Sequence, residues 1–212
     1  MEAYTKLESK RYNNVILRVI PGHFVTPNSH INYYFDMTTI SRRQAEAKAA
    51  ADSISEYFSS DTIIDTIVCL EGMDVIGAYL ADALTRSGIL SANMHKTMYV
   101  VAPESRMTGQ MIFRESSEYM LKNKNCLVLL ASATTGGTLR QAANTVNYYG
   151  GKVVGFATIF SAITSVAGIR VCSLFSPKDV PDYKSYTHSE CPMCKNGRKV
   201  DAICNGYGYT RL

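Results

Sequence analysis

Apolar residues in this chain occur in short runs, each followed by a polar or glycine-containing segment. The run at 127–131 is too short for a useful helix and carries no polar alternation, which is typical of a parallel strand covered on both faces. Small polar residues follow it, and apolar residues then recur at helical spacing over 139–149, where Gly150 and Gly151 act as a stop. This stretch predicts a buried strand, a loop and a helix in succession.

The same alternation of strand and helix extends along most of the chain. Ser41 followed by Gln44 matches a capping box at the start of an alanine-rich helix. The repeated pattern predicts an α/β fold with a doubly wound, mostly parallel sheet. We predict further strands over 15–20, 61–70, 96–101, 152–159 and 168–174, and further helices over 42–58, 75–85 and 111–121.

Two segments do not follow this alternation. Pro21-Gly22 predicts a turn into residues 23–37, which are rich in Tyr, Phe, Asn, His and Ser. We interpret these residues as a loop. The simplest interpretation is a packed aromatic loop, and the functional one is a loop that lines a pocket. From residue 176 the periodicity is weak. We therefore expect one domain over 1–175, with an irregular tail over 176–212 packed on it.

The loop after the strand at 127–131 is the principal candidate site. Its glycines permit positive backbone dihedrals and close approach of a ligand to the main chain. Unpaired N–H groups and the positive end of the helix dipole would surround one point there, which suits a phosphate. The residues of this phosphate cup are Thr134, Thr135, Gly136, Gly137 and Thr138.

A second strand, loop and helix unit begins at 61–70 and has the same architecture. Carboxyl ends of neighbouring parallel strands meet at one edge of a sheet, so we expect its loop to hold a second group of the same ligand. The residues of this second loop are Glu71, Gly72, Met73 and Asp74.

The bulk composition restricts the function classes. Of the 212 residues, 46% are hydrophobic and 19% are charged, and the net charge is +4, without a basic stripe or a block of like charge. These values predict a globular protein that binds neither nucleic acid nor membrane. Three of the six cysteines lie in apolar, strand-like runs, a pattern more typical of reduced thiols than of a disulfide framework, so we expect a cytoplasmic protein.

The run from Leu127 to Leu139, with its helix and the strand after Gly151, resembles the phosphoribosyl-pyrophosphate motif of the type I phosphoribosyltransferases. Segments 22–36, 71–77 and 99–110 narrow the resemblance to the orotate phosphoribosyltransferase branch. The resemblance implies a small-molecule phosphate ligand, phosphoribosyl pyrophosphate or a nucleotide, and also magnesium and a homodimer. It implies Arg106 as the catalytic cation at the leaving group, and Tyr34 and Asp36 in the base pocket.

The chain departs from the family pattern in several places. Ala131 and Ser132 stand where two adjacent carboxylates normally hold the ribose hydroxyls. Losing two charged acceptors weakens sugar binding by about 3 to 6 kcal/mol. Ala102 and Pro103 replace a basic pair of the mobile loop, Thr108 replaces a histidine, and a lysine expected near 26–27 is absent.

Cys191 and Cys194 form a Cys-x-x-Cys pair near His188 and Cys204, a set that could hold zinc. A ribbon-type zinc site needs a second such pair, so free thiols and a redox pair are alternatives, and we assign no metal ligand.

The sequence leaves three hypotheses. The first is a phosphoribosyltransferase of pyrimidine nucleotide metabolism, and the second is a non-catalytic relative that binds a nucleotide or sugar phosphate as a sensor. The third is a purely structural role for the glycine-threonine turn.

Overall fold

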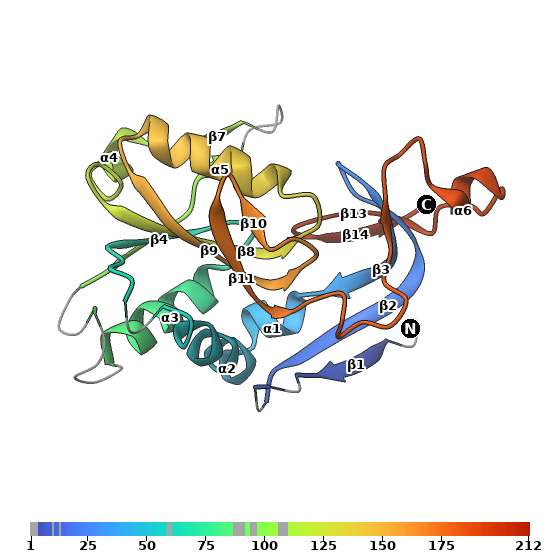
Figure 1. The fold of residues 1–212 in the computed structure, drawn as a ribbon, viewed down its shortest axis with the longest axis horizontal. Coiled ribbons are helices and arrows are strands. Elements are labelled where there is room, and N and C mark those ends of the chain that lie inside the picture. The colour runs from blue at the N-terminus through green and yellow to red at the C-terminus, as the bar shows by residue number, and fades with distance from the viewer. Residues whose placement is uncertain are drawn as a thin grey trace.

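A computed structural model describes residues 4–9, 11–12, 14–58, 61–86, 92–93, 97–105 and 110–212. Two six-stranded sheets lie next to each other, and a two-stranded ribbon adjoins the first of them (Figure 1). The ribbon pairs β6 (Glu104–Ser105) with β7 (Met111–Ile112).

The first sheet has the strand order β10-β11-β9-β8-β4-β5. All its pairings are parallel except the edge pair of β10 with β11. This confirms the predicted doubly wound, mostly parallel sheet. Its strands are β4 (Thr66–Cys69), β5 (Tyr99–Val101), β8 (Asn125–Ala133), β9 (Lys152–Ser161), β10 (Ser165–Val166) and β11 (Ile169–Phe175).

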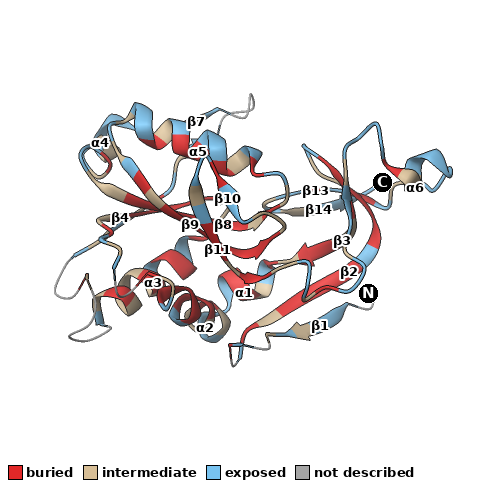
Figure 2. Cartoon of the chain, viewed as in Figure 1, coloured by how far each residue is buried: buried red, intermediate tan, exposed pale blue. Residues whose placement is uncertain are grey.

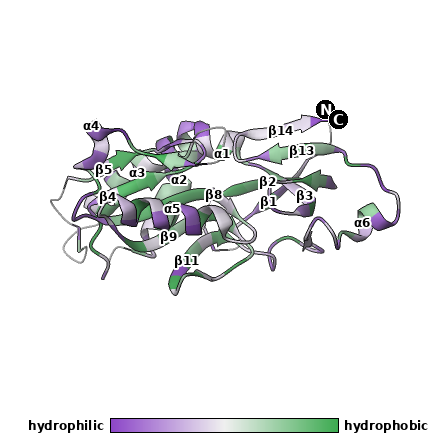
Figure 3. Ribbon diagram, turned by 90° about the horizontal axis from the view of Figure 1, so that it is seen from above, coloured by the Kyte–Doolittle hydropathy of each residue, from purple (hydrophilic) through white to green (hydrophobic). Residues whose placement is uncertain are grey.

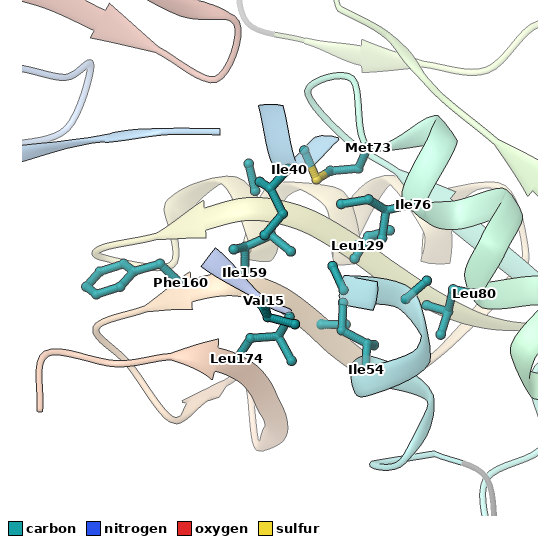
Figure 4. Close-up of a cluster of buried hydrophobic side chains, with 14 of the residues drawn as sticks. Val15, Ile40, Ile54, Met73, Ile76, Leu80, Leu129, Ile159, Phe160 and Leu174 are labelled. Atoms are coloured by element: carbon teal, nitrogen blue, oxygen red, sulfur yellow. The ribbon is translucent and has the colours of Figure 1, made fainter. Parts of the chain in front are cut away.

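Helices cover both faces of this sheet, which is why β8 is apolar on every residue of its central run. Leu129 packs with Ile54 of α2 (Gln44–Ser55) and Leu80 of α3 (Asp74–Arg86) in one cluster (Figure 4). Its neighbours Val128 and Leu130 pack on the other face against α5 (Gly137–Tyr148). Successive strand side chains point to opposite faces, so a strand buried on both faces shows no alternation.

The second sheet joins the two ends of the chain. Its order is β12-β3-β2-β13-β14, with β1 also paired to β2, and only the pairing of β13 with β2 is parallel. Both termini lie on this side of the molecule (Figure 1). Its strands are β1 (Thr5–Glu8), β2 (Ile16–Val25), β3 (His30–Asp36), β12 (Ser185–Tyr186), β13 (Ala202–Asn205) and β14 (Gly208–Arg211).

This second sheet corrects two expectations. The predicted turn at Pro21-Gly22 is instead a shift of register within one long strand, and most of the segment predicted as a loop is strand. A proline is tolerated at such an irregularity because the ladder bond is already interrupted there. The tail expected to be irregular contributes β12, β13, β14 and the short helix α6 (Pro192–Lys195).

Two helix predictions also differ from the structure. The helix predicted over 42–58 is divided, because Arg43 is extended between α1 (Thr38–Arg42) and α2. Ser41 therefore lies inside α1, where its hydroxyl donates to the carbonyl of Thr38, and forms no capping box. Residues 111–121, whose apolar face is thin, form β7 and the one-turn helix α4 (Glu115–Glu118) instead of one helix.

The buried residues lie mainly in and around the two sheets. Buried residues concentrate in the central strands and on the inner faces of α2, α3 and α5 (Figure 2). Seen from above, hydrophobic residues follow the strands, whereas the segment around α6 projects away from them (Figure 3). Among the residues described, no helix combines the length and the apolar character needed to cross a membrane.

Candidate functional site

A cleft of about 360 Å³ lies where the carboxyl ends of β4 and β8 face the second sheet. The parallel sheet contributes the loops after these two strands, and the second sheet contributes the β2–β3 loop, β3 and the β13–β14 turn. Residues that line the cleft include Thr26, Asn28, Ile31, Tyr34, Phe35, Arg42, Glu71, Met73, Ala131, Ser132, Thr134, Thr138, Cys204, Gly206 and Tyr207.

The residues predicted to form the phosphate cup lie in the turn that starts α5. Gly136 is the N-cap of α5 with φ of 80°, and a Cβ there would lie 2.7 Å from Ile163 Cδ1, so only glycine fits. Within the described part of the chain, the hydroxyls of Thr134, Thr135 and Thr138 have no hydrogen-bond partner, nor have the amides of residues 135–138. These donors surround the positive end of a helix dipole and are available to an anion.

The second loop meets the cup because β4 and β8 are adjacent and parallel. Glu71 and Gly72 both have positive φ, 53° and 77°, so the chain turns sharply after β4. The Glu71 carboxyl group lines the cleft and packs against Gly206 of the β13–β14 turn, and this burial raises its pKa to about 7. Glu71 is therefore partly protonated at neutral pH.

Two polar residues that sequence reasoning did not assign to the site also lie here. Arg42, at the end of α1, lines the cleft, and its guanidinium would be 3.5 Å from a Cβ placed on Gly72. The Asn28 amide lies similarly close to Gly137, 3.7 Å from a Cβ built there. Nothing in the local sequence distinguishes Arg42 from its neighbour Arg43, because its role depends on the turn at Glu71.

The structure separates the expected base-pocket pair, because Asp36 is the last residue of β3 and bonds to the chain that leads into α1. Tyr34 lines the cleft, and its ring lies 4.9 Å from that of Tyr209. Burial raises the pKa of Tyr34, which keeps its phenol protonated. Asp36 is not among the lining residues and instead accepts a hydrogen bond of 2.9 Å from the amide of Thr38.

The other expected residues have different positions. Met73 lines the cleft from the apolar core, whereas Asp74 is exposed in the first turn of α3, where its charge complements the helix dipole. Thr135 and Gly137 are exposed at the rim of the cup. Arg106 and Thr108 lie outside the described residues.

The floor of the cleft is formed by the end of β8. Ala131 and Ser132 both line it, at the positions where the resemblance called for carboxylates. Among the described lining residues, Glu71 is the one acid and Arg42 the one permanent cation. The cleft is thus suited to a phosphorylated ligand, with a polar but weakly charged surface for the sugar.

Comparison with known proteins supports this description. The orotate phosphoribosyltransferase of Sulfurimonas denitrificans is 26% identical over 198 residues, covering 86% of this chain and 90% of the relative. That of Sulfurovum sp. is 28% identical over 195 residues, covering 84% and 89%. The Mycobacterium tuberculosis orotate phosphoribosyltransferase in complex with phosphoribosyl pyrophosphate superposes with a TM-score of 0.51 at 18% identity, covering 69% of this chain and 82% of that structure.

No family model matches the chain. The fold is that of the type I phosphoribosyltransferases, and the chain is similar in sequence to orotate phosphoribosyltransferases, so both expectations are confirmed.

Proposed function

We propose that this protein transfers ribose 5-phosphate from phosphoribosyl pyrophosphate to a base, with orotate as the first candidate. In this reaction a ring nitrogen of the base bonds to the anomeric carbon of the ribose, and the bond from that carbon to pyrophosphate breaks. The observation that carries the proposal is the convergence of the phosphate cup and the Glu71 loop in one cleft. Two adjacent anion-binding loops match a ligand that is phosphorylated at both ends.

The cup would bind the 5-phosphate. Its free amides and the hydroxyls of Thr134 and Thr138 supply donors, and the dipole of α5 favours the negative charge. Asn28, beside Gly137, would donate from the opposite wall. A fixed phosphate orients the ribose toward the base. This orientation is the main way in which the protein would accelerate the reaction, because it supplies no nucleophile of its own.

The Glu71 loop would bind the pyrophosphate. Arg42 lies over Gly72 and supplies the positive charge that the leaving group needs, and Arg106 would add a second cation. Magnesium would fit this position with Glu71 in its ionised form, because the carboxylate and the oxygens of pyrophosphate are ligands that the ion accepts. When bound, the ion would neutralise the charge that develops on the departing pyrophosphate.

The second sheet would bind the base. Ile31, Tyr34 and Phe35 give this part of the cleft an apolar and aromatic lining. Planar bases stack favourably on such a lining, and the adjacent β13–β14 turn, with Tyr207, would restrict entry of water.

A turnover assay tests the proposal. The protein is incubated with phosphoribosyl pyrophosphate, magnesium and orotate, uracil, guanine or adenine in turn, and pyrophosphate release is measured. Release with one base supports the proposal and identifies the base. Absence of release with every base, with all substrates in excess, would contradict it.

The composition of the cleft floor favours a second candidate, a non-catalytic protein that binds nucleotides or sugar phosphates. Ala131 and Ser132 cannot provide the charged acceptors expected for ribose hydroxyls, whereas the cup retains its donors. Calorimetry with nucleoside monophosphates separates the two candidates: binding without turnover supports the sensor. We also infer a homodimer, as the family resemblance implies, and a cytoplasmic location, as the reduced cysteines suggest. Size-exclusion chromatography with light scattering tests the first, and cell fractionation tests the second.

A further inference from the structure

Outside the cleft, the fold brings together four side chains that have ligand atoms for a soft divalent metal. They are His23 in β2, His30 at the start of β3, and Cys191 and Cys194 at either end of the first turn of α6. Their four donor atoms all lie within 4.8 Å of one another. His23, His30 and Cys191 are buried, at 0%, 7% and 0% exposure.

The distances within this cluster agree with a tetrahedral zinc site. Cys194 Sγ lies 3.5 Å from His23 Nε2 and 3.4 Å from His30 Nδ1, and Cys191 Sγ lies 3.6 Å from His23 Nε2. Zinc bonds of about 2.3 Å to sulfur and about 2.0 to 2.1 Å to nitrogen separate tetrahedral N and S ligands by about 3.6 Å. The two ring nitrogens, now 2.9 Å apart, need to separate to about 3.3 Å to fit the same geometry.

The second nitrogen of His23 has the partner that a metal ligand requires. His23 Nδ1 lies 3.1 Å from the carbonyl oxygens of both Arg198 and Lys199 and donates its proton to them. In the neutral ring this arrangement fixes the tautomer that has its lone pair on Nε2, which faces the two sulfurs and His30. Metal-binding histidines are oriented in this way by a carbonyl on their outer nitrogen.

Most of the segment that carries the cysteines is exposed to solvent. Residues 187–190 and 194–199 are exposed, and this segment projects from the sheet (Figures 2 and 3). The backbone nevertheless turns tightly, because the amides of Lys195 and Arg198 donate to the carbonyls of Cys191 and Met193. A buried cysteine in such a turn, with two buried histidines opposite, is poorly explained by apolar packing.

From this geometry we propose that His23, His30, Cys191 and Cys194 bind one structural zinc ion. Four protein ligands close the coordination shell, so the ion has no open position for catalysis. Binding displaces the two thiol protons and joins the β2–β3 hairpin to the α6 turn. Both connected segments lead directly into the cleft, through Thr26 and Asn28 on one side and residues 204–208 on the other. The ion would therefore hold two walls of the proposed ligand site in place.

The ligand set differs from the one that the sequence suggested. His188 Nε2 donates to the carbonyl of Thr26, 3.2 Å away, and Cys204 donates to the carbonyl of Val25 at 3.4 Å. Neither belongs to the cluster. The second pair of ligands comes from two strands at the opposite end of the chain, so no second Cys-x-x-Cys is needed.

The test is the metal content of the purified full-length protein, expressed with zinc and without a metal-affinity tag. We expect about one zinc ion per chain by mass spectrometry, falling to under about a tenth in Cys194→Ser. The matched variants His188→Asn and Cys204→Ser should retain the ion, because they alter a neighbouring histidine and cysteine outside the ligand set.

A second measurement does not depend on the variants folding. Wild-type protein with its metal exchanged for cobalt should show the intense visible bands of tetrahedral coordination and near-ultraviolet thiolate charge transfer. Wild-type protein that retains no zinc and gives no such cobalt spectrum, or that contains a Cys191–Cys194 disulfide when freshly purified, would overturn the proposal. Neither measurement uses phosphoribosyl pyrophosphate, so the result is independent of whether the proposed transferase activity is found.

Discussion

The carboxyl group of Glu71 lies directly against Gly206, so closely that a Cβ on Gly206 would stand 1.9 Å from Glu71 Cδ. One residue follows a central strand of the parallel sheet, and the other lies in the hairpin turn near the end of the chain. Their contact closes one side of the cleft and buries the acid. The C-terminal hairpin is therefore part of the proposed ligand site.

Gly206→Ala should displace Glu71 and weaken binding of nucleoside monophosphates or phosphoribosyl pyrophosphate by about tenfold or more, because the two groups cannot occupy the same space. Glu71→Ala in the same background should relieve the clash. We expect a coupling of about 1 to 3 kcal/mol in the free energy of unfolding from the double-mutant cycle. Additive effects of the two changes would show that the residues are not in contact.

The raised pKa of Glu71 predicts a specific pH dependence of stability. Its folded-state pKa of about 7 exceeds its ordinary value of 4.5, so the folded protein binds more protons than the unfolded chain between these values. The contribution of Glu71 to the free energy of unfolding is therefore largest below pH 4.5. It falls as the pH rises through 7, by up to about 3 kcal/mol. Urea unfolding of wild type and Glu71→Gln over this range measures the difference, and the variant should lack this fall. Parallel pH profiles of the two proteins would contradict the prediction.

Gly137→Asp should abolish phosphate binding while leaving the fold intact, because it places a carboxylate at the exposed start of α5, where the anion would lie. Gly137→Ala is the matched control. A Cβ at this position meets only ordinary contacts, 3.7 Å or more away, so the alanine variant should bind within a fewfold of wild type. Calorimetry with a nucleoside monophosphate measures both, and equal affinities would indicate a purely structural turn.

Gly136→Ala should destabilise the protein more than Gly168→Ala does. Both glycines have φ near 80°, but a Cβ on Gly136 would meet Ile163 and Val166 below 3.0 Å, whereas nothing lies within 4 Å at Gly168. The shared dihedral costs each variant about 1 kcal/mol, and the clash adds about 1 to 3 kcal/mol at Gly136. Chemical denaturation measures both losses, and a similar loss in both variants would exclude the packing explanation.

Arg42→Gln should weaken pyrophosphate or phosphoribosyl pyrophosphate binding by about 10- to 100-fold, since it removes a charged donor from the cleft. Arg43→Gln is the matched control, because Arg43 is exposed and pairs at 3.5 Å with Glu46 outside the cleft. Affinity measured at two salt concentrations should show reduced salt dependence only for Arg42→Gln. An equal effect of both changes would indicate general surface charge.

The amino-acid sequence alone determined the alternation of strands and helices and the turn before α5, because both depend on short-range signals. The apolar run of β8, the positive-φ glycine at 136 and the helical spacing of α5 are adjacent in the chain and follow from local conformational preference and burial. The same holds for the turn after β4, where Glu71 and Gly72 follow a second buried run.

Only the tertiary structure decided which distant residues meet. Arg42 and Gly206 carry no distinguishing local pattern, and the Cys191–Cys194 pair does not by itself indicate which histidines lie beside it. The pairing of β13 with β2 joins the two ends of the chain and brings the histidines to the cysteines. The expected loop at 23–37 became strand because β12 and β13 extend the sheet from both sides, an interaction that residues 23–37 do not encode by themselves. Long-range pairing thus converted a weakly patterned tail into a wall of the cleft and brought His23 and His30 to Cys191 and Cys194.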